Sequence, residues 1–172
     1  MLIITEKPSV AKDFAKALAC SFSAFDQAYK SRDGEIIIVH CVEHLFNLQQ
    51  PNFYDERFKH WNQLPIIPHQ FAYDVNPQTK DVAKNVIQHI KNHKNDEILI
   101  ATDADREGEI IARECLLASR ISDYSKIKRF WVSQALTQTL FLKELKTQNQ
   151  ATNMMILQNR GLQDKKQIGL WV

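Results

Sequence analysis

The sequence predicts an α/β domain in which a parallel sheet is flanked by helices. Two observations favour this class: short apolar runs alternate with stretches of helical periodicity, and each apolar run is continuous, as in strands buried on both faces. The 172 residues contain no internal repeat, low-complexity tract or obvious linker, and this length suffices for one domain with its own core. We therefore expect one α/β domain.

The N-terminal half supplies two of the expected strands. The first is the apolar run Leu2–Thr5, and Pro8-Ser9 behind it is typical of a helix start. The turn signal Asp33-Gly34 precedes the second strand, whereas prolines and aromatic residues characterise the loop that follows. The expected elements of this half are a strand at 2–5, a helix at 10–19, a strand at 35–40 and a loop at 49–70.

The C-terminal half continues the alternation. Val82, Val86 and Ile90 recur at helical spacing, and residues 97–102 form the clearest strand pattern of the chain. Strands that alternate with helices in this way pair in parallel. The expected elements of this half are a helix at 79–93, a strand at 97–102, a helix at 107–119, a strand at 129–133 and a helix at 137–146.

Composition excludes several classes of protein and leaves function to local motifs. A hydrophobic fraction of 44% and a charged fraction of 24% are ordinary for a globular protein, and a net charge of +2 is too small to indicate a nucleic-acid partner. No apolar run approaches the roughly 18 residues of a membrane helix. The odd number of cysteines predicts neither disulfides nor a zinc site, but buried thiols in a cytoplasmic protein: Cys20, Cys41 and Cys115.

An acidic motif follows the clearest strand. Asp103 and Asp105 lie where this strand ends, and Glu107 follows as the next helix begins. Side chains two apart in an extended chain point the same way, and open α/β sheets bind ligands at the carboxyl ends of their strands. Clustered carboxylates repel one another, and Mg²⁺ relieves that repulsion by binding their oxygens. A solvated loop before a helix N-terminus is the alternative interpretation.

A second polar segment, Glu6-Lys7, follows the first strand. In a parallel sheet this strand and the strand at 97–102 end at the same edge, so Glu6 is expected to complete a carboxylate cluster. Lys7 is then placed to meet a phosphate beside the metal ion. An exposed Glu–Lys pair taken alone indicates only solvated surface, but the two segments support each other.

These segments resemble the Toprim domain of type IA DNA topoisomerases, most closely that of the topoisomerase III branch. The resemblance implies a Rossmann-like Toprim sheet over residues 1–147, although Glu43 stands where the family usually has glycine and residues 21–34 match poorly. The matching residues are Glu6-Lys7-Pro8-Ser9, His44-Leu45, Pro51, Tyr54-Asp55, Arg57, Trp61, Leu64-Pro65-Ile66-Ile67-Pro68, Phe71, Asp103-Ala104-Asp105-Arg106-Glu107-Gly108-Glu109, Trp131-Val132-Ser133 and Ala135-Leu136-Thr137.

The resemblance implies a catalytic site that binds Mg²⁺. Its metal and acid–base cluster is expected to consist of four carboxylates: Glu6, Asp103, Asp105 and Glu107. In the family one such acid handles the proton of a sugar hydroxyl, and the metal ion orients the scissile phosphate. Gly108 suits a close approach of the backbone as the helix starts.

The resemblance also implies three DNA-binding residues. Lys7 is expected to stabilise charge on the scissile phosphate. Arg106 serves the same phosphate or supports the acids structurally, and the sequence leaves both roles open. His44 contacts DNA in the family context, whereas a histidine packed and hydrogen-bonded in the domain is the alternative.

The resemblance covers only part of a type IA enzyme. Such enzymes cut one DNA strand with a tyrosine that lies in a separate domain, and none of the tyrosines here matches it: Tyr29, Tyr54, Tyr73 and Tyr124. Residues 148–172 form a C-terminal tail that does not resemble the family in this frame. If the gene is read from the third base of each codon, synonymous codons allow a family-like run. We therefore interpret the tail as the product of a frameshift near residue 158. The nucleotide sequence of the gene tests this interpretation.

The sequence thus predicts the Mg²⁺-binding Toprim domain of a type IA DNA topoisomerase, an isomerase that breaks, passes and rejoins DNA strands. The domain alone is expected to be inactive because the tyrosine is missing. The implied partners are single-stranded DNA and a protein that supplies the missing domains, and no membrane partner is expected. The expected location is the cytoplasm, and in a bacterium the nucleoid. Two alternatives stay open: an Mg²⁺-dependent Toprim nuclease, and a non-catalytic DNA-binding module.

Overall fold

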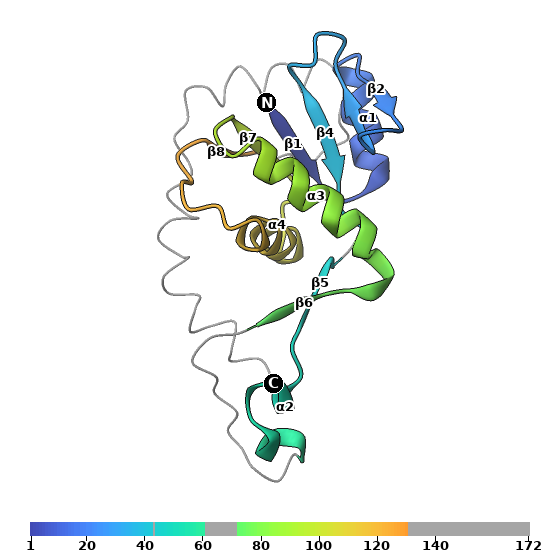
Figure 1. Cartoon of the computed structure of the whole chain (residues 1–172). Coiled ribbons are helices and arrows are strands. Elements are labelled where there is room, and N and C mark those ends of the chain that lie inside the picture. The colour runs from blue at the N-terminus through green and yellow to red at the C-terminus, as the bar shows by residue number, and fades with distance from the viewer. Residues whose placement is uncertain (43, 61–71, 131–172) are drawn as a thin grey trace.

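A six-stranded sheet forms the centre of the protein (Figure 1). The computed structural model describes residues 1–42, 44–60 and 72–130. The strands lie in the order β2-β3-β4-β1-β7-β8, and the last four of them pair in parallel. Their bounds are β1 (Leu2–Thr5), β2 (Ser21–Ser23), β3 (Ala28–Lys30), β4 (Ile37–His40), β7 (Ile98–Ala101) and β8 (Ile127–Arg129).

Helices cover both faces of this sheet, because the apolar side chains of its central strands alternate between two cores. On one face, α1 (Pro8–Ala17) packs Phe14 against Ile3. On the other face, α3 (Lys80–Asn92) and α4 (Arg106–Ala118) pack against Leu2 and Ile4 (Figure 1). Burial on both faces explains why the central strands are continuous apolar runs. The predicted α/β sheet flanked by helices is therefore confirmed.

The register of the parallel strands determines where the polar segments meet. Thr5, the last residue of β1, lies opposite His40 of β4 and Ala101 of β7. The three strands therefore end level with one another, at one edge of the sheet. The residues that follow β1 and β7 are brought together there, although almost a hundred positions separate them in the sequence.

A two-stranded antiparallel ribbon extends from the sheet domain. It consists of β5 (Phe46–Leu48) and β6 (Tyr73–Val75), and two short helices follow β5, α2 (Pro51–Tyr54) and η1 (Glu56–Lys59). The hydroxyl of Tyr54 accepts a hydrogen bond from the backbone N–H of Ala72 at 2.7 Å and donates one to the Ala72 carbonyl at 3.3 Å. Tyr54 thus ties the start of the predicted loop to the residue just beyond its end.

Strand β5 was not predicted, and the short helices α2 and η1 lie inside the predicted loop; the structure departs from the predicted elements in two further places. Strands β2 and β3 form an antiparallel hairpin on β4 that the sequence did not indicate, because each spans three residues and β2 is largely exposed. Strand β8 ends at Arg129, where the predicted strand begins. Its single apolar residue, Ile127, is buried opposite Ile98 but stands between charged neighbours and so forms no apolar run. A short 3-10 helix, η2 (Pro77–Thr79), comes directly before α3.

Several predictions lie outside the described residues. These are the strand beyond residue 130, the helix at 137–146, the tail at 148–172 and residues 61–70 of the loop predicted at 49–70. The cysteines do fall within the described residues: Cys41 and Cys115 are buried, as expected, with Sγ atoms 3.7 Å apart, whereas Cys20 is partly exposed. None of the three forms a disulfide. The hydrogen bond with Cys41, and then burial, raise the pKa of the Cys115 thiol.

Candidate active site

The carboxyl edge of the sheet brings Glu6 and Asp103 into direct contact. Glu6 follows β1 and is 6% exposed, and its Oε2 accepts a hydrogen bond from the backbone N–H of Asp103 at 3.0 Å. Asp103 lies two residues beyond β7, and 44% of its side chain is exposed. One carboxylate is therefore held inside the domain while the other faces solvent beside it.

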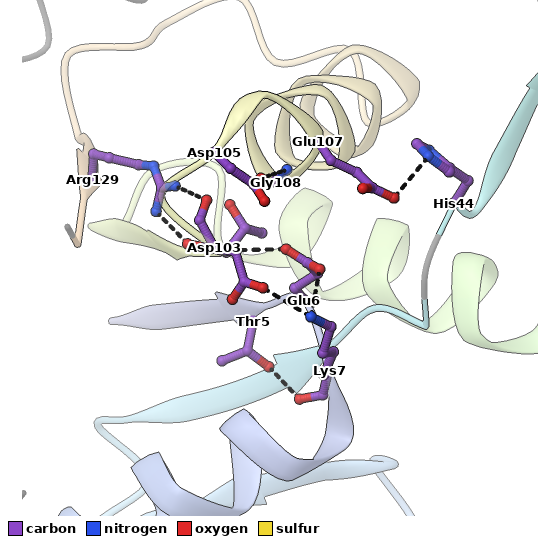
Figure 2. Close-up of polar contacts among 10 residues, drawn as sticks. Thr5, Glu6, Lys7, His44, Asp103, Asp105, Glu107, Gly108 and Arg129 are labelled. Atoms are coloured by element: carbon purple, nitrogen blue, oxygen red, sulfur yellow. Dashed lines mark hydrogen bonds and ion pairs between the residues drawn. The ribbon is translucent and has the colours of Figure 1, made fainter. Parts of the chain in front are cut away.

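Lys7 lies between these two carboxylates (Figure 2). Its ammonium nitrogen is 2.8 Å from Oδ2 of Asp103 and 3.2 Å from Oε1 of Glu6. The hydrogen bond to Asp103, and then that to Glu6, raise the pKa of Lys7, so its side chain stays charged at neutral pH. Because Pro8 opens α1, Lys7 is held in an extended backbone conformation, which lets its side chain reach back over the edge of the sheet.

Asp105 caps the helix that carries the rest of the motif. Its Oδ1 accepts a hydrogen bond from the backbone N–H of Gly108 at 2.7 Å, which satisfies one of the unpaired donors at the start of α4. Gly108 is buried against the loop: a Cβ atom at this position would lie 2.3 Å from the carbonyl oxygen of Asp103. The expected close approach of the backbone at Gly108 is therefore confirmed.

Glu107 points away from Glu6 and toward His44 (Figure 2). Its Oε1 lies 3.4 Å from Nε2 of His44, and the other ring nitrogen of His44 lies 3.9 Å from Oε2 of Glu114. Burial raises the pKa of Glu114 to about 7, although His44 acts in the opposite direction. His44 is thus placed between two glutamates of α4, and 45% of its side chain is exposed to solvent.

The predicted site residues therefore form two adjoining groups. Glu6, Lys7 and Asp103 make one, and Glu107 and His44 make the other, with Asp105 and the exposed Arg106 at the helix start between them. Within residues 1–42, 44–60 and 72–130, no three side chains of His, Cys, Asp or Glu converge closely enough to hold a metal ion. Metal binding by the four acids stays a prediction.

One residue beneath the motif, Arg129, was missed by the sequence reasoning. Arg129 of β8 reaches under the acidic loop, where it pairs with Glu109 of α4 and donates a hydrogen bond to the carbonyl oxygen of Asp103 at 2.7 Å. An arginine at the end of a charged strand gives no sign of this role in the sequence. The only signal was the unexplained second glutamate of the motif, Glu109.

Several known proteins have sequences similar to this chain. Residues 1–135 match the Toprim domain family. The chain is 37% identical over 134 residues to DNA topoisomerase 3 of Staphylococcus haemolyticus and 35% identical over 141 residues to that of Staphylococcus saprophyticus. These alignments cover 77% and 81% of the chain but only 18% and 19% of the relatives. The chain therefore spans about a fifth of the length of the relatives it matches.

A solved structure shows the same fold. Topoisomerase I from Thermotoga maritima superposes with a TM-score of 0.55 at 21% identity, over 85% of this chain and 20% of that one. At this level of identity the similarity concerns the fold alone. Across the described part of the chain, no helix combines the length and apolar character needed to cross a membrane.

Proposed function

The chain belongs to the Toprim domain family, and from this premise we propose that it is the metal-binding domain of a type IA DNA topoisomerase of the topoisomerase III kind. The observation that carries the proposal is the contact of Glu6, Lys7 and Asp103 at the carboxyl edge of the sheet. Its relatives named DNA topoisomerase 3 are about four times as long, which supports a division of the active site between this domain and others.

The donor chemistry of the site fits Mg²⁺. Glu6 and Asp103 concentrate negative charge around a partly exposed point, and the ammonium group of Lys7 already binds there at 2.8 and 3.2 Å. Carboxylate oxygens are the ligands that Mg²⁺ prefers. We propose that the ion is held by Glu6, Asp103, Asp105 and Glu107; when bound, it would neutralise and orient the scissile phosphate.

The remaining residues act on the phosphate and on the proton. Lys7 is half exposed and permanently charged, so it would stabilise negative charge on a phosphate at the edge of the sheet. Arg106 is exposed at the start of α4, where helix N–H groups also favour anions. One of the carboxylates would donate a proton to the sugar oxygen that leaves when the strand is cut, and would take it back from the sugar hydroxyl on rejoining. His44 would meet the DNA beside Glu107.

We further propose that the substrate is single-stranded DNA, that the nucleophilic tyrosine comes from other domains or a partner protein, and that the site of action is the cytoplasm. The test incubates supercoiled plasmid with the purified chain, with Mg²⁺ or with EDTA. Unchanged supercoils are expected, together with Mn²⁺ binding that is lost in Asp103→Asn and kept in Asp13→Asn, which alters an exposed carboxylate on α1.

The result that would refute this proposal is specific. Open circles that form only with Mg²⁺ and disappear in Asp105→Asn would identify a nuclease, the alternative in which water replaces the tyrosine. Binding of DNA with no affinity for Mn²⁺ would identify a non-catalytic DNA-binding module.

A further inference from the structure

The guanidinium group of Arg129 is buried under the acidic loop, with only 6% of its side chain exposed. Figure 2 shows it beside Asp103, to the left, on the side opposite Glu6. The side chain pairs with the carboxylate of Glu109 through Nε. Its Nη1 and Nη2 atoms donate to four backbone carbonyls: Asp103 at 2.7 Å, Thr102 at 2.8 Å, Phe130 at 2.8 Å and Ile100 at 3.2 Å.

Two of these carbonyls, those of Thr102 and Asp103, need a donor that the sheet does not supply, whereas that of Ile100 already accepts from the Phe130 N–H at 2.8 Å. Strand β7 ends at Ala101, so the carbonyl groups of Thr102 and Asp103 lie beyond its ladder and before the first turn of α4. A buried carbonyl without a hydrogen-bond donor destabilises the fold. Arginine carries five N–H donors in a planar fork, and this geometry allows one side chain to serve several carbonyls and one carboxylate together.

The peptide groups on either side of Asp103 are consequently held from three directions. Glu6 accepts from the Asp103 N–H at 3.0 Å, Arg129 donates to its carbonyl oxygen at 2.7 Å, and Gly108 lies against the same carbonyl, where a Cβ atom would be only 2.3 Å away. With its backbone held in this way, the carboxylate of Asp103 is directed toward Lys7. The direction of that side chain therefore depends on a residue of a different strand.

We propose that Arg129, with Glu109 as its counter-ion, is a positioning residue that sets the backbone of the acidic loop and thereby the direction of the Asp103 carboxylate. Arg129 touches no substrate atom from its buried place; it acts through Asp103. Glu109 neutralises the guanidinium charge, which would be costly to bury alone. The consequence for catalysis rests on the proposed function, whereas the consequence for the loop does not.

Hydrogen exchange on the full chain without metal tests the positioning directly. In Arg129→Lys, which keeps the charge but loses the planar fork, the protection factor of the Asp103 amide should fall at least tenfold. The amide of Cys41 serves as the internal reference, because it lies at the same edge and donates to the Thr5 carbonyl at 2.8 Å. Its protection should stay within about twofold. Lys128→Met, the control on the same strand, removes the ion pair with Glu97 and should change neither amide.

Glu109→Gln provides a second variant that does not depend on the folding of Arg129→Lys, and it should lower Asp103 protection in the same selective way. Unchanged Asp103 protection in either folded variant would overturn the inference, as would an equal loss at Asp103 and Cys41. Titration with Mn²⁺ then addresses the function separately: Arg129→Lys should bind it at least tenfold more weakly than the unmodified chain. If the unmodified chain binds no Mn²⁺, the proposed function fails, while the amide result still decides the role of Arg129.

Discussion

Replacement of Gly108 by alanine should damage the acidic loop far more than it damages the fold. The added Cβ atom would lie 2.3 Å from the carbonyl oxygen, 2.9 Å from the nitrogen and 3.1 Å from the carbonyl carbon of Asp103. An ordinary contact between carbon and oxygen needs about 3.3 Å, so the start of α4 and the loop must separate by about 1 Å. All three atoms belong to the backbone, and no side chain can rotate to relieve the contact.

The cost to stability follows from two unfavourable effects and one favourable effect. Overpacking of this kind destabilises by about 1–3 kcal/mol, and loss of the Asp105 cap, whose bond to Gly108 is 2.7 Å long, adds about 1 kcal/mol. Alanine gains up to about 1 kcal/mol in helix propensity over glycine. We expect a net decrease of about 1–3 kcal/mol in the free energy of unfolding. A misplacement of about 1 Å at the acids should reduce any rate that depends on them by up to about 100-fold.

For Gly108→Ala, urea unfolding measures the loss of stability, and Mn²⁺ titration separately measures the damage to the acidic loop. The matched control is Gly34→Ala, which forces alanine into a φ of 75° with no atom within 4 Å of the new Cβ. That strain costs about 1–2 kcal/mol in a turn far from the site. The control should lose stability but bind Mn²⁺ normally. If Gly108→Ala binds Mn²⁺ as tightly as Gly34→Ala does, the close approach at Gly108 does not govern the site.

Three further predictions concern charge and packing. Burial raises the pKa of Glu114 from 4.5 to about 7, so the folded state binds an extra proton and the free energy of unfolding should fall as pH rises through this interval. Glu114→Gln should remove this pH dependence and gain at most about 3 kcal/mol at pH 8. If urea unfolding gives the same change in the free energy of unfolding between pH 5 and pH 8 for both proteins, the prediction is wrong. Lys7→Gln removes the cation between two carboxylates, so Mn²⁺ should bind more tightly and single-stranded DNA more weakly. Mn²⁺ titration measures the first effect, and fluorescence anisotropy of labelled DNA measures the second. If the two affinities rise together or fall together, the proposed role of Lys7 is wrong. Phe14→Ala removes a ring that is 1% exposed and in edge-to-face contact with Phe130, so the free energy of unfolding should fall by about 3–5 kcal/mol in urea or thermal unfolding. A decrease below about 1 kcal/mol would show that the core on that face collapses around the cavity.

Much of the fold and the location of the site could be predicted from the sequence, because both depend on local patterns. Continuous apolar runs identify strands buried on both faces, and parallel pairing places the ends of β1 and β7 at one edge. These two facts were enough to bring Glu6 and Lys7 to Asp103. The hairpin β2–β3 and the start of β8 were missed, since three-residue strands with polar or charged neighbours carry no apolar period.

Only the tertiary structure decided what each side chain contacts within the site. The sequence placed Asp105 and Glu107 beside Asp103, yet the rotation of α4 turns Asp105 into a helix cap and directs Glu107 to His44. Sequence spacing determines which residues arrive at an edge, but side-chain direction depends on how a helix is rotated against its sheet. For the same reason Arg129 itself gave no signal: apart from Glu109, the partners named for it are backbone carbonyls, and these have the same chemistry in every residue.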